Sequence, residues 1–173
     1  MKEAERKIRS VGQEGNYIYC VLHDAHEMKP TGVEIIGYTG SEIIVHIPGR
    51  LGGLPVLRIG RAVYKDKTNI VCVFCPSALT AIGVQAFDGC TALEDVYLSS
   101  RLERLESRAF GGCRAMRKIL IPARTVVSES AFDGCDGLEV LRRIQVGFFE
   151  NGKTMQIDLG ERMFREKRDS LPE

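Results

Sequence analysis

The sequence has no excess of charge of either sign, because 24 lysine and arginine residues are balanced by 23 aspartate and glutamate residues over 173 positions. A net charge of +1 gives no electrostatic attraction for a polyanion, so we predict no nucleic-acid partner. No run of apolar residues approaches the length of a transmembrane helix. We therefore predict no membrane span.

The N-terminus lacks the apolar run of a secretory signal. Residues 1–7 are mostly charged, and no apolar segment follows them. The sequence as it stands predicts a cytoplasmic protein, or a secreted or cell-surface protein if a leader was removed. The six cysteines are compatible with either compartment.

Motifs that carry catalysis or metal binding are also missing. We find no nucleophile elbow, no His-Glu-x-x-His string and no zinc-ribbon spacing. His23, Asp24, His26 and Glu27 lie close in sequence, but their spacing matches no standard zinc site, so we interpret this segment as a solvated loop. We predict no enzymatic activity, no metal and no cofactor.

The pair Cys72-x-x-Cys75 has the spelling of a redox motif but the wrong local structure. Residues three apart on a strand point to opposite faces, so the two thiols cannot easily meet. We expect Cys75 to face the core and Cys72 to face outward.

What the sequence does contain is an internal repeat. Ala-Phe-Asp-Gly-Cys at 86–90 recurs at 131–135, and recurs with one substitution at 109–113. Cys113 follows Cys90 by 23 residues, and Cys135 follows Cys113 by 22. This period is typical of leucine-rich repeats, in which each repeat is one turn of a solenoid and neighbouring turns complete the core.

Apolar positions extend the same period along the chain. Apolar-x-apolar segments at 73–75, 96–98 and 119–121 are each followed by proline or serine, which predicts one short strand per turn. Similar strands are predicted at 45–47 and 138–141, the second after a shortened turn. Phenylalanine and aliphatic side chains would fill the space between turns, and glycine would allow the sharpest bends.

The repeated cysteines form a column of their own. Stacked once per turn, Cys90, Cys113 and Cys135 would lie about 4.8 Å apart along the backbone, a separation that permits a disulfide. Three thiols would leave one unpaired, so we favour a reduced structural ladder over a disulfide or a metal site.

The pattern Ile-Gly-x-x-Ala-Phe-x-x-Cys-x-x-Leu-x-x-Val-x-Leu, read from Ile82 to Leu98, resembles the BspA-like branch of the leucine-rich repeat family. The resemblance is clearest over residues 59–141. It implies a short right-handed solenoid of the α/β-solenoid class, mainly β, with hairpin-like caps. Members of this family are often bacterial surface or secreted proteins proposed to bind proteins or host molecules. Lys67 replaces the cysteine in the first full turn and Arg143 replaces an aliphatic residue in the last strand, so we expect the stack to close there.

We predict a single domain over residues 1–173, with an N-terminal cap at 1–40, repeats at 41–143 and a C-terminal cap and tail at 144–173. Within the N-terminal cap, 1–15 is predicted as a frayed or helical arm, and 17–22 with 33–36 as a hairpin. The charged segment 161–168 is predicted as a short solvated helix or tail.

Residues 147–154 spell Gly-x-x-x-x-Gly-Lys-Thr, the string of a phosphate-binding loop. Such a loop must open a helix, whereas alternation of period two follows it here. Asn151-Gly152 is instead a strong signal for a two-residue hairpin turn. We favour the hairpin and keep nucleotide binding as a third, less favoured function.

Alternate positions of the predicted strands should form outward columns on the exposed sheet. One column contains His46, Phe74, Tyr97, Leu120 and Arg142, and the other contains Ile44, Cys72, Asp95, Lys118 and Val140. We predict that the first column, with Asp95 and Lys118, binds a protein or peptide partner. The alternative is a purely structural or self-associating segment, including a homodimer.

Overall fold

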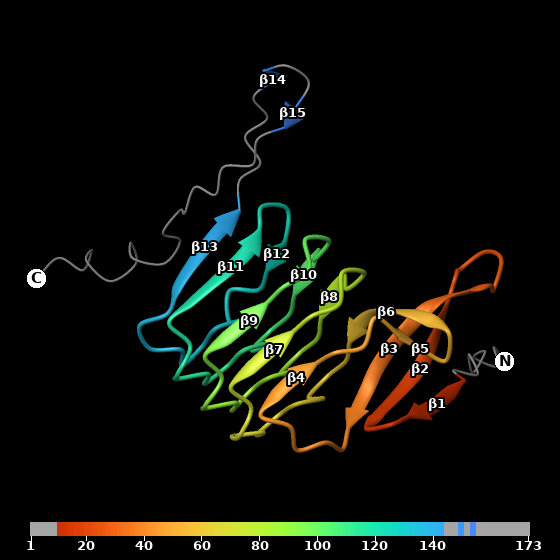
Figure 1. Ribbon diagram of the computed structural model, residues 1–173, viewed down its shortest axis with the longest axis horizontal. Coiled ribbons are helices and arrows are strands. Elements are labelled where there is room, and N and C mark those ends of the chain that lie inside the picture. The colour runs from red at the N-terminus through yellow and green to blue at the C-terminus, as the bar shows by residue number, and fades with distance from the viewer. Residues whose placement is uncertain (1–9, 144–148, 151–152, 155–173) are drawn as a thin grey trace, which may run out of the picture.

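The computed structural model of the protein describes residues 10–143 and the two short strands at 149–150 and 153–154. These residues form a mainly-β solenoid, in which parallel strands join successive turns of the chain (Figure 1). No helix occurs among the described residues. The predicted solenoid fold is confirmed.

Each regular turn contributes strands to two sheets on opposite sides of the core. The first sheet has the order β1-β2-β3-β6-β8-β10-β12, with β5 attached to β6. Its strands are β1 (Val11–Glu14), β2 (Tyr17–His23), β3 (Pro30–Tyr38), β5 (Arg50–Leu51), β6 (Leu54–Ile59), β8 (Ala81–Ile82), β10 (Arg104–Leu105) and β12 (Val126–Val127). The sequence predicts only one strand per turn, because two-residue strands are too short to show a periodicity.

The second side carries the strands that the sequence predicted, but they do not form one continuous sheet. β4 (Ile44–His46), β7 (Cys72–Phe74) and β9 (Asp95–Tyr97) form a three-stranded parallel sheet. β11 (Lys118–Pro122) and β13 (Glu139–Arg143) form a separate parallel pair. Within the described residues, no strand pairing joins β9 to β11.

An antiparallel cap covers the N-terminal end of the coils. β1, β2 and β3 pair antiparallel in sequence order, and β3 then pairs parallel with β6. The predicted hairpin of 17–22 and 33–36 is confirmed. The predicted arm at 1–15 is wrong over Val11–Glu14, which is strand β1; residues 1–9 lie outside the described part of the chain.

A column of stacked rings runs through the core. Tyr64, Phe87 and Phe110 are fully buried, and Phe132 at the C-terminal end is half-buried. Neighbouring ring centroids lie 4.7, 5.2 and 5.8 Å apart, with planes within 6° of parallel. We call this set the core ladder. Its spacing is close to the 4.7–4.9 Å between paired strands, because equal turns of chain bring one ring per turn into the same position.

The repeated cysteines bond each turn to the one before it. The thiol of Cys90 donates to the backbone oxygen of Tyr64 (3.1 Å), that of Cys113 to Phe87 (3.3 Å) and that of Cys135 to Phe110 (2.9 Å). All six cysteines are free thiols. Lys67, which replaces the cysteine of the first full turn, serves the same purpose because its Nζ donates to the backbone oxygen of Gly40 at 2.9 Å.

Gly83 is required by the close approach of two turns. A Cβ added there would lie 2.9 Å from the backbone oxygen of Ile59 and 3.0 Å from the carbonyl carbon of Gly60. We expect Gly83→Ala to lower the free energy of unfolding by about 1–3 kcal/mol, because backbone atoms must move to admit the methyl group. Urea unfolding followed by circular dichroism measures this. The matched control is Gly49→Ala, where an added Cβ meets nothing within 4 Å; equal losses at both sites would contradict the packing argument.

Candidate functional site

Three aromatic side chains line up on the outer face of the β4-β7-β9 sheet. His46, Phe74 and Tyr97 are the last residues of their strands, and the strand register places them side by side. The centroids of His46 and Phe74 lie 4.5 Å apart with parallel planes, and those of Phe74 and Tyr97 lie 4.7 Å apart at 3°. We call this set the aromatic strip. His46 and Tyr97 are exposed, with 55% of Tyr97 accessible to water.

The stacking determines which part of each ring meets the solvent. Because the rings stack across the strands, their faces are covered by one another and their edges point outward. Sugars and nucleobases bind best on open aromatic faces, so the interior of this strip offers them little. Ring edges carry partial positive charge and pack against aliphatic groups, aromatic faces and sulfur. The geometry therefore suits apolar protein side chains.

Aliphatic residues extend the exposed apolar surface at the β4 end. Ile43 and Ile44 are 59% and 53% exposed, although both are large hydrophobic side chains. Cys72 lies beside Ile44 in the register and is half-buried. Burial and the nearby Asp95 carboxylate raise the pKa of the Cys72 thiol, so it is a neutral side chain on this surface. Ile44 and Cys72 lie two residues before His46 and Phe74 on the same strands, so they share the face of the aromatic strip and extend its apolar surface.

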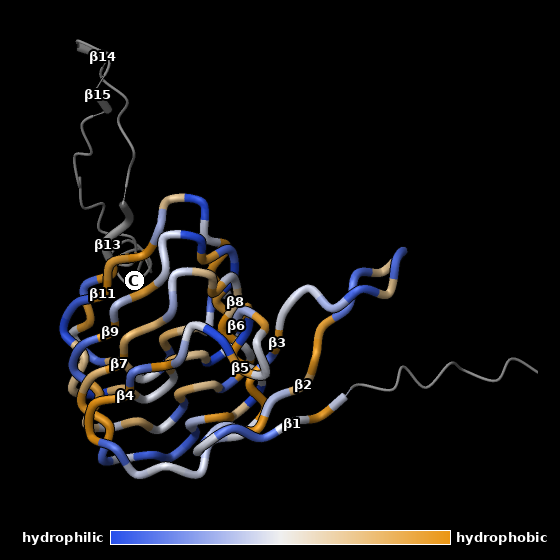
Figure 2. Tube along the Cα trace, turned by 45° about the vertical axis from the view of Figure 1, so that its right-hand side comes forward, coloured by the Kyte–Doolittle hydropathy of each residue, from blue (hydrophilic) through white to orange (hydrophobic). Residues whose placement is uncertain are grey.

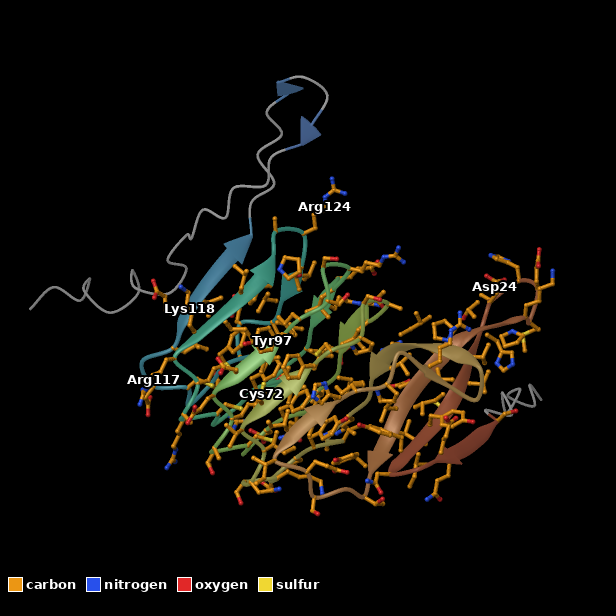
Figure 3. The ribbon with its side chains drawn as sticks, in the orientation of Figure 1. Asp24, Cys72, Tyr97, Arg117, Lys118 and Arg124 are labelled. Atoms are coloured by element: carbon orange, nitrogen blue, oxygen red, sulfur yellow. The ribbon has the colours of Figure 1, made fainter. Side chains whose placement is uncertain are left out.

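Two charged residues follow on the next strands of the same face. Figure 3 shows Tyr97 on β9 and Lys118 on the neighbouring strand β11, with Cys72 on β7. Asp95 and Lys118 are both exposed. Among the described residues, no salt bridge joins either side chain to a partner. Leu120, which follows Tyr97 in the predicted column, is half-buried.

The register of the last strand corrects the predicted columns. Leu141, not Arg142, lies opposite Leu120, and Glu139, not Val140, lies opposite Lys118. Arg142 lies opposite Ile121 in the register. The error arises because only 21 residues separate Ile119 from its partner Val140, against 23 between Val96 and Ile119. The last turn is therefore two residues shorter than the regular turn of 23, whereas the predicted columns assumed that it was one residue shorter.

Residues 24–27 lie in the exposed loop between β2 and β3, as predicted, whereas His23 is the last residue of β2. The Asp24 carboxylate accepts hydrogen bonds from the backbone N–H groups of His26 (2.8 Å) and Glu27 (2.9 Å), and these bonds lower the pKa of Asp24. Figure 2 shows the β2–β3 hairpin extending away from the coils to a hydrophilic tip. Within the described residues, no group of three or more His, Cys, Asp or Glu side chains is placed to hold a metal ion.

The described residues of the phosphate-loop string lie on strands rather than at the start of a helix. β14 (Phe149–Glu150) and β15 (Lys153–Thr154) pair antiparallel, with Glu150 opposite Lys153. Lys153 and Thr154 are therefore strand residues, which is the predicted hairpin. The remaining residues of the string, 147–148 and 151–152, lie outside the described part of the chain, as does the segment 161–168 predicted as a helix or tail.

Cys72 and Cys75 do not form a redox pair. Both are free, and Cys75 packs against the core while Cys72 lies on the outer face. Burial raises the pKa of the Cys75 thiol to about 12. A thiol with so high a pKa is a poor nucleophile at neutral pH.

Comparison with protein families places the repeats in a known group. The profile described as "BspA type Leucine rich repeat region (6 copies)" matches residues 57–162. The match extends beyond residue 143, where we predicted that the repeats end. A search of curated proteins gave no match. The described part of the chain holds no helix of the length and hydropathy that a bilayer crossing needs.

Three solved structures are similar to the chain. A leucine-rich repeat protein from Bacteroides capillosus is 26% identical with a TM-score of 0.64, and the match covers 76% of this chain and 98% of that one. A leucine-rich repeat protein of T. pallidum is 24% identical (TM-score 0.56; 80% and 71% covered). One from Bacteroides ovatus is 22% identical (TM-score 0.57; 75% and 40% covered). The last two support the fold alone.

Proposed function

Because the chain belongs to the BspA-type leucine-rich repeat family, we propose that it is a non-catalytic interaction module that binds a protein or peptide partner through the aromatic strip. The observation that carries the proposal is the exposure of the aromatic strip, in which Tyr97 is the most important residue. Among the described residues, no strand or helix covers this face of the sheet. Repeat solenoids use such extended faces for recognition.

The size of the face limits the affinity. The paired strands β4, β7 and β9 have three residues each, and at about 4.8 Å between strands and about 10 Å of length they present on the order of 150 Å². This is about a fifth of one partner's share of a standard interface, near 800 Å². The strip alone therefore suits weak, reversible binding, and tighter binding requires contacts from other parts of the chain.

The test compares what the wild-type protein and two variants retain from a lysate of the native host. In the double variant Phe74→Glu, Tyr97→Glu, buried charge replaces the apolar contacts of the interface. We expect a binding loss of at least about 2 kcal/mol, or roughly thirtyfold. The matched control is Val11→Glu, Val126→Glu, which places the same two charges at exposed apolar residues of the opposite sheet.

Circular dichroism and melting temperature must first establish that all three proteins fold. A partner retained by the wild type and by the control, but not by the strip variant, supports the proposal. Identical sets of retained proteins would contradict it.

Self-association is the second candidate, and the order of charges on the face favours it. Within the described part of the chain, Asp95 and Lys118 form no salt bridge, and they lie on neighbouring strands. A twofold axis parallel to the strands between β9 and β11 would place Asp95 of each copy opposite Lys118 of the other. Masses of the same proteins in solution distinguish the two functions, because a dimer lost only in the strip variant indicates that the occupant is a second copy.

A further inference from the structure

The repeated cysteines end in a pair of thiols on the last two described turns. Cys113 lies between β10 and β11, and Cys135 lies between β12 and β13. Figure 1 shows these strands on neighbouring turns at the C-terminal end of the coils. Beside the thiols the two turns are bonded together, because the backbone N–H of Gly112 donates to the oxygen of Asp133 at 2.7 Å. Equivalent positions of bonded turns lie about 4.8 Å apart, which is inside the Cα range that a disulfide spans.

The two thiols also lie within hydrogen-bonding reach of each other. In the reduced protein the thiol of Cys113 donates to the oxygen of Phe87, and that of Cys135 donates to the oxygen of Phe110. When Cys135 loses its proton, the Cys113 thiol can turn and donate to the thiolate instead. The pair therefore combines a nucleophile with an adjacent proton donor.

The environments of the three ladder thiols differ. Cys90 and Cys113 are fully buried, whereas Cys135 is half-buried at the end of the column. A hydrogen bond from the Cys113 thiol lowers the pKa of Cys135 in spite of burial, and a backbone hydrogen bond from Cys113 and the nearby Arg108 guanidinium act in the same direction. The same thiol contact, together with burial, raises the pKa of Cys113. Cys135 is therefore the thiol that ionises first, while Cys113 keeps its proton.

Cys72 is half-buried like Cys135 but has none of these neighbours. Its register partners across the sheet are Ile44 and Asp95, so no second thiol is adjacent to it there. Burial and the Asp95 carboxylate raise its pKa. Reactivity governed by exposure alone would make the two thiols similar, whereas their surroundings favour Cys135.

We propose that Cys135 and Cys113 form an oxidation site, at which a peroxide converts the two thiols into a disulfide that joins the last two described turns. The proposal is independent of the proposed function. It rests on two thiols held at equivalent positions of bonded turns, with the more exposed one at the end of the column.

The reaction takes two steps and consumes one molecule of hydrogen peroxide. The Cys135 thiolate attacks one peroxide oxygen, the O–O bond breaks, and a sulfenic acid and hydroxide result. The Cys113 sulfur then attacks the sulfenic sulfur, the S–O bond breaks, and the hydroxyl leaves as water with the Cys113 proton. The first hydroxide takes up the proton that Cys135 lost. Two thiols are thus oxidised to one disulfide while the peroxide is reduced to two waters.

Oxidation exchanges one kind of link between turns for another. The disulfide has no thiol protons, so the backbone oxygens of Phe87 and Phe110 lose the donors that they have in the reduced protein. A covalent bond between Cys113 and Cys135 takes over the connection of the last two described turns. The reduced ladder and the disulfide are therefore two states of the same column.

Hydrogen peroxide applied to the folded, full-length wild-type protein tests the site. Free thiols are then blocked with iodoacetamide, and the disulfides are identified by mass spectrometry of the digest. We expect a link between residues 113 and 135 that is at least about tenfold more abundant than any other, since folding holds these two thiols together. The same treatment in urea is the control and should remove the preference. Another main disulfide in the folded protein, or none, would overturn the proposal.

Two single variants test the order of the steps, after circular dichroism shows that they fold. In Cys113→Ser the reaction should stop at a sulfenic acid on Cys135, which a cyclic 1,3-dione traps. In Cys135→Ser, Cys113 should stay reduced. Cys90→Ser is the matched control and should still form the link between residues 113 and 135. A trapped sulfenic acid on Cys113 rather than Cys135 would overturn the assignment.

A measurement on the wild type keeps the test decisive if these variants fail to fold. At neutral pH, iodoacetamide should alkylate Cys135 at least about tenfold faster than Cys72, because the thiolate is the reacting species and each pKa unit changes its fraction tenfold. Both side chains are half-buried, so exposure does not account for such a difference. Equal rates, or faster alkylation of Cys72, would contradict the assignment of Cys135 as the reactive thiol.

Discussion

Phe110→Ala is expected to lower the free energy of unfolding by about 3–5 kcal/mol. Phe110 is fully buried, and its ring lies between Phe87 at 5.2 Å and Phe132 at 5.8 Å. Truncation removes both stacking contacts and leaves a cavity between two turns, which the backbone hydrogen bonds between turns prevent from collapsing. Urea unfolding, followed by circular dichroism, measures the loss.

Two variants make this prediction specific to the core ladder. Phe110→Leu keeps most of the buried volume and should cost clearly less, because only the aromatic stacking is lost. Tyr97→Ala removes a ring of similar size from the exposed aromatic strip and should cost little. A loss at Tyr97 as large as that at Phe110 would mean that the strip is part of the structural core.

Alkaline pH is expected to destabilise the protein through its buried thiols. Burial raises the pKa of Cys75 and of Cys90 to about 12, whereas a cysteine in the unfolded chain titrates near about 8.5. The unfolded state therefore loses protons that the folded state still holds. Stability is complete below about pH 8.5 and falls as the pH rises toward 12, by about 1.4 kcal/mol per pH unit for each thiol. Tyr64, whose pKa burial raises well above its usual value, acts in the same direction.

Unfolding free energies at several pH values between 8 and 11 measure this slope. The double variant Cys75→Ala, Cys90→Ala should show a shallower slope, whatever its stability at pH 8. Val73→Ala is the control, because it truncates a fully buried residue that does not titrate; it should lower the stability at every pH and leave the slope unchanged. An unchanged slope in the cysteine variant would show that these thiols titrate normally.

The sequence was sufficient to predict the periodic part of the fold. A spacing of 23 residues between Cys90 and Cys113 fixed the length of one turn, and the strands and the core columns followed from it. Turns of equal length bring equivalent positions of neighbouring repeats into contact, so the repeat length predicts which residues touch in the folded chain. The N-terminal hairpin and the β14–β15 hairpin were predicted because their turn and strand signals are local.

Errors arose where the period changes or where the elements are very short. Arg142 was assigned to the outward column because the spacing of 22 residues from Cys113 to Cys135 was applied to the whole turn. The paired strands β11 and β13 are offset by only 21 residues. The strands β8, β10 and β12 were missed because two residues carry no alternation. The role of Lys67 was also missed: the sequence showed a departure from cysteine, whereas the structure shows a longer side chain that donates to the same kind of acceptor.

The candidate site divides in the same way. The amino-acid sequence determined which residues could face outward, because side-chain direction alternates along a strand. It did not determine that His46, Phe74 and Tyr97 stack face to face and present their edges. Nor did it determine that β9 and β11 lack strand pairing, or that Asp95 and Lys118 form no salt bridge with any other described residue. Those properties depend on the distance and rotation between neighbouring turns, which no single turn encodes, and so they are set by the packing of the whole stack.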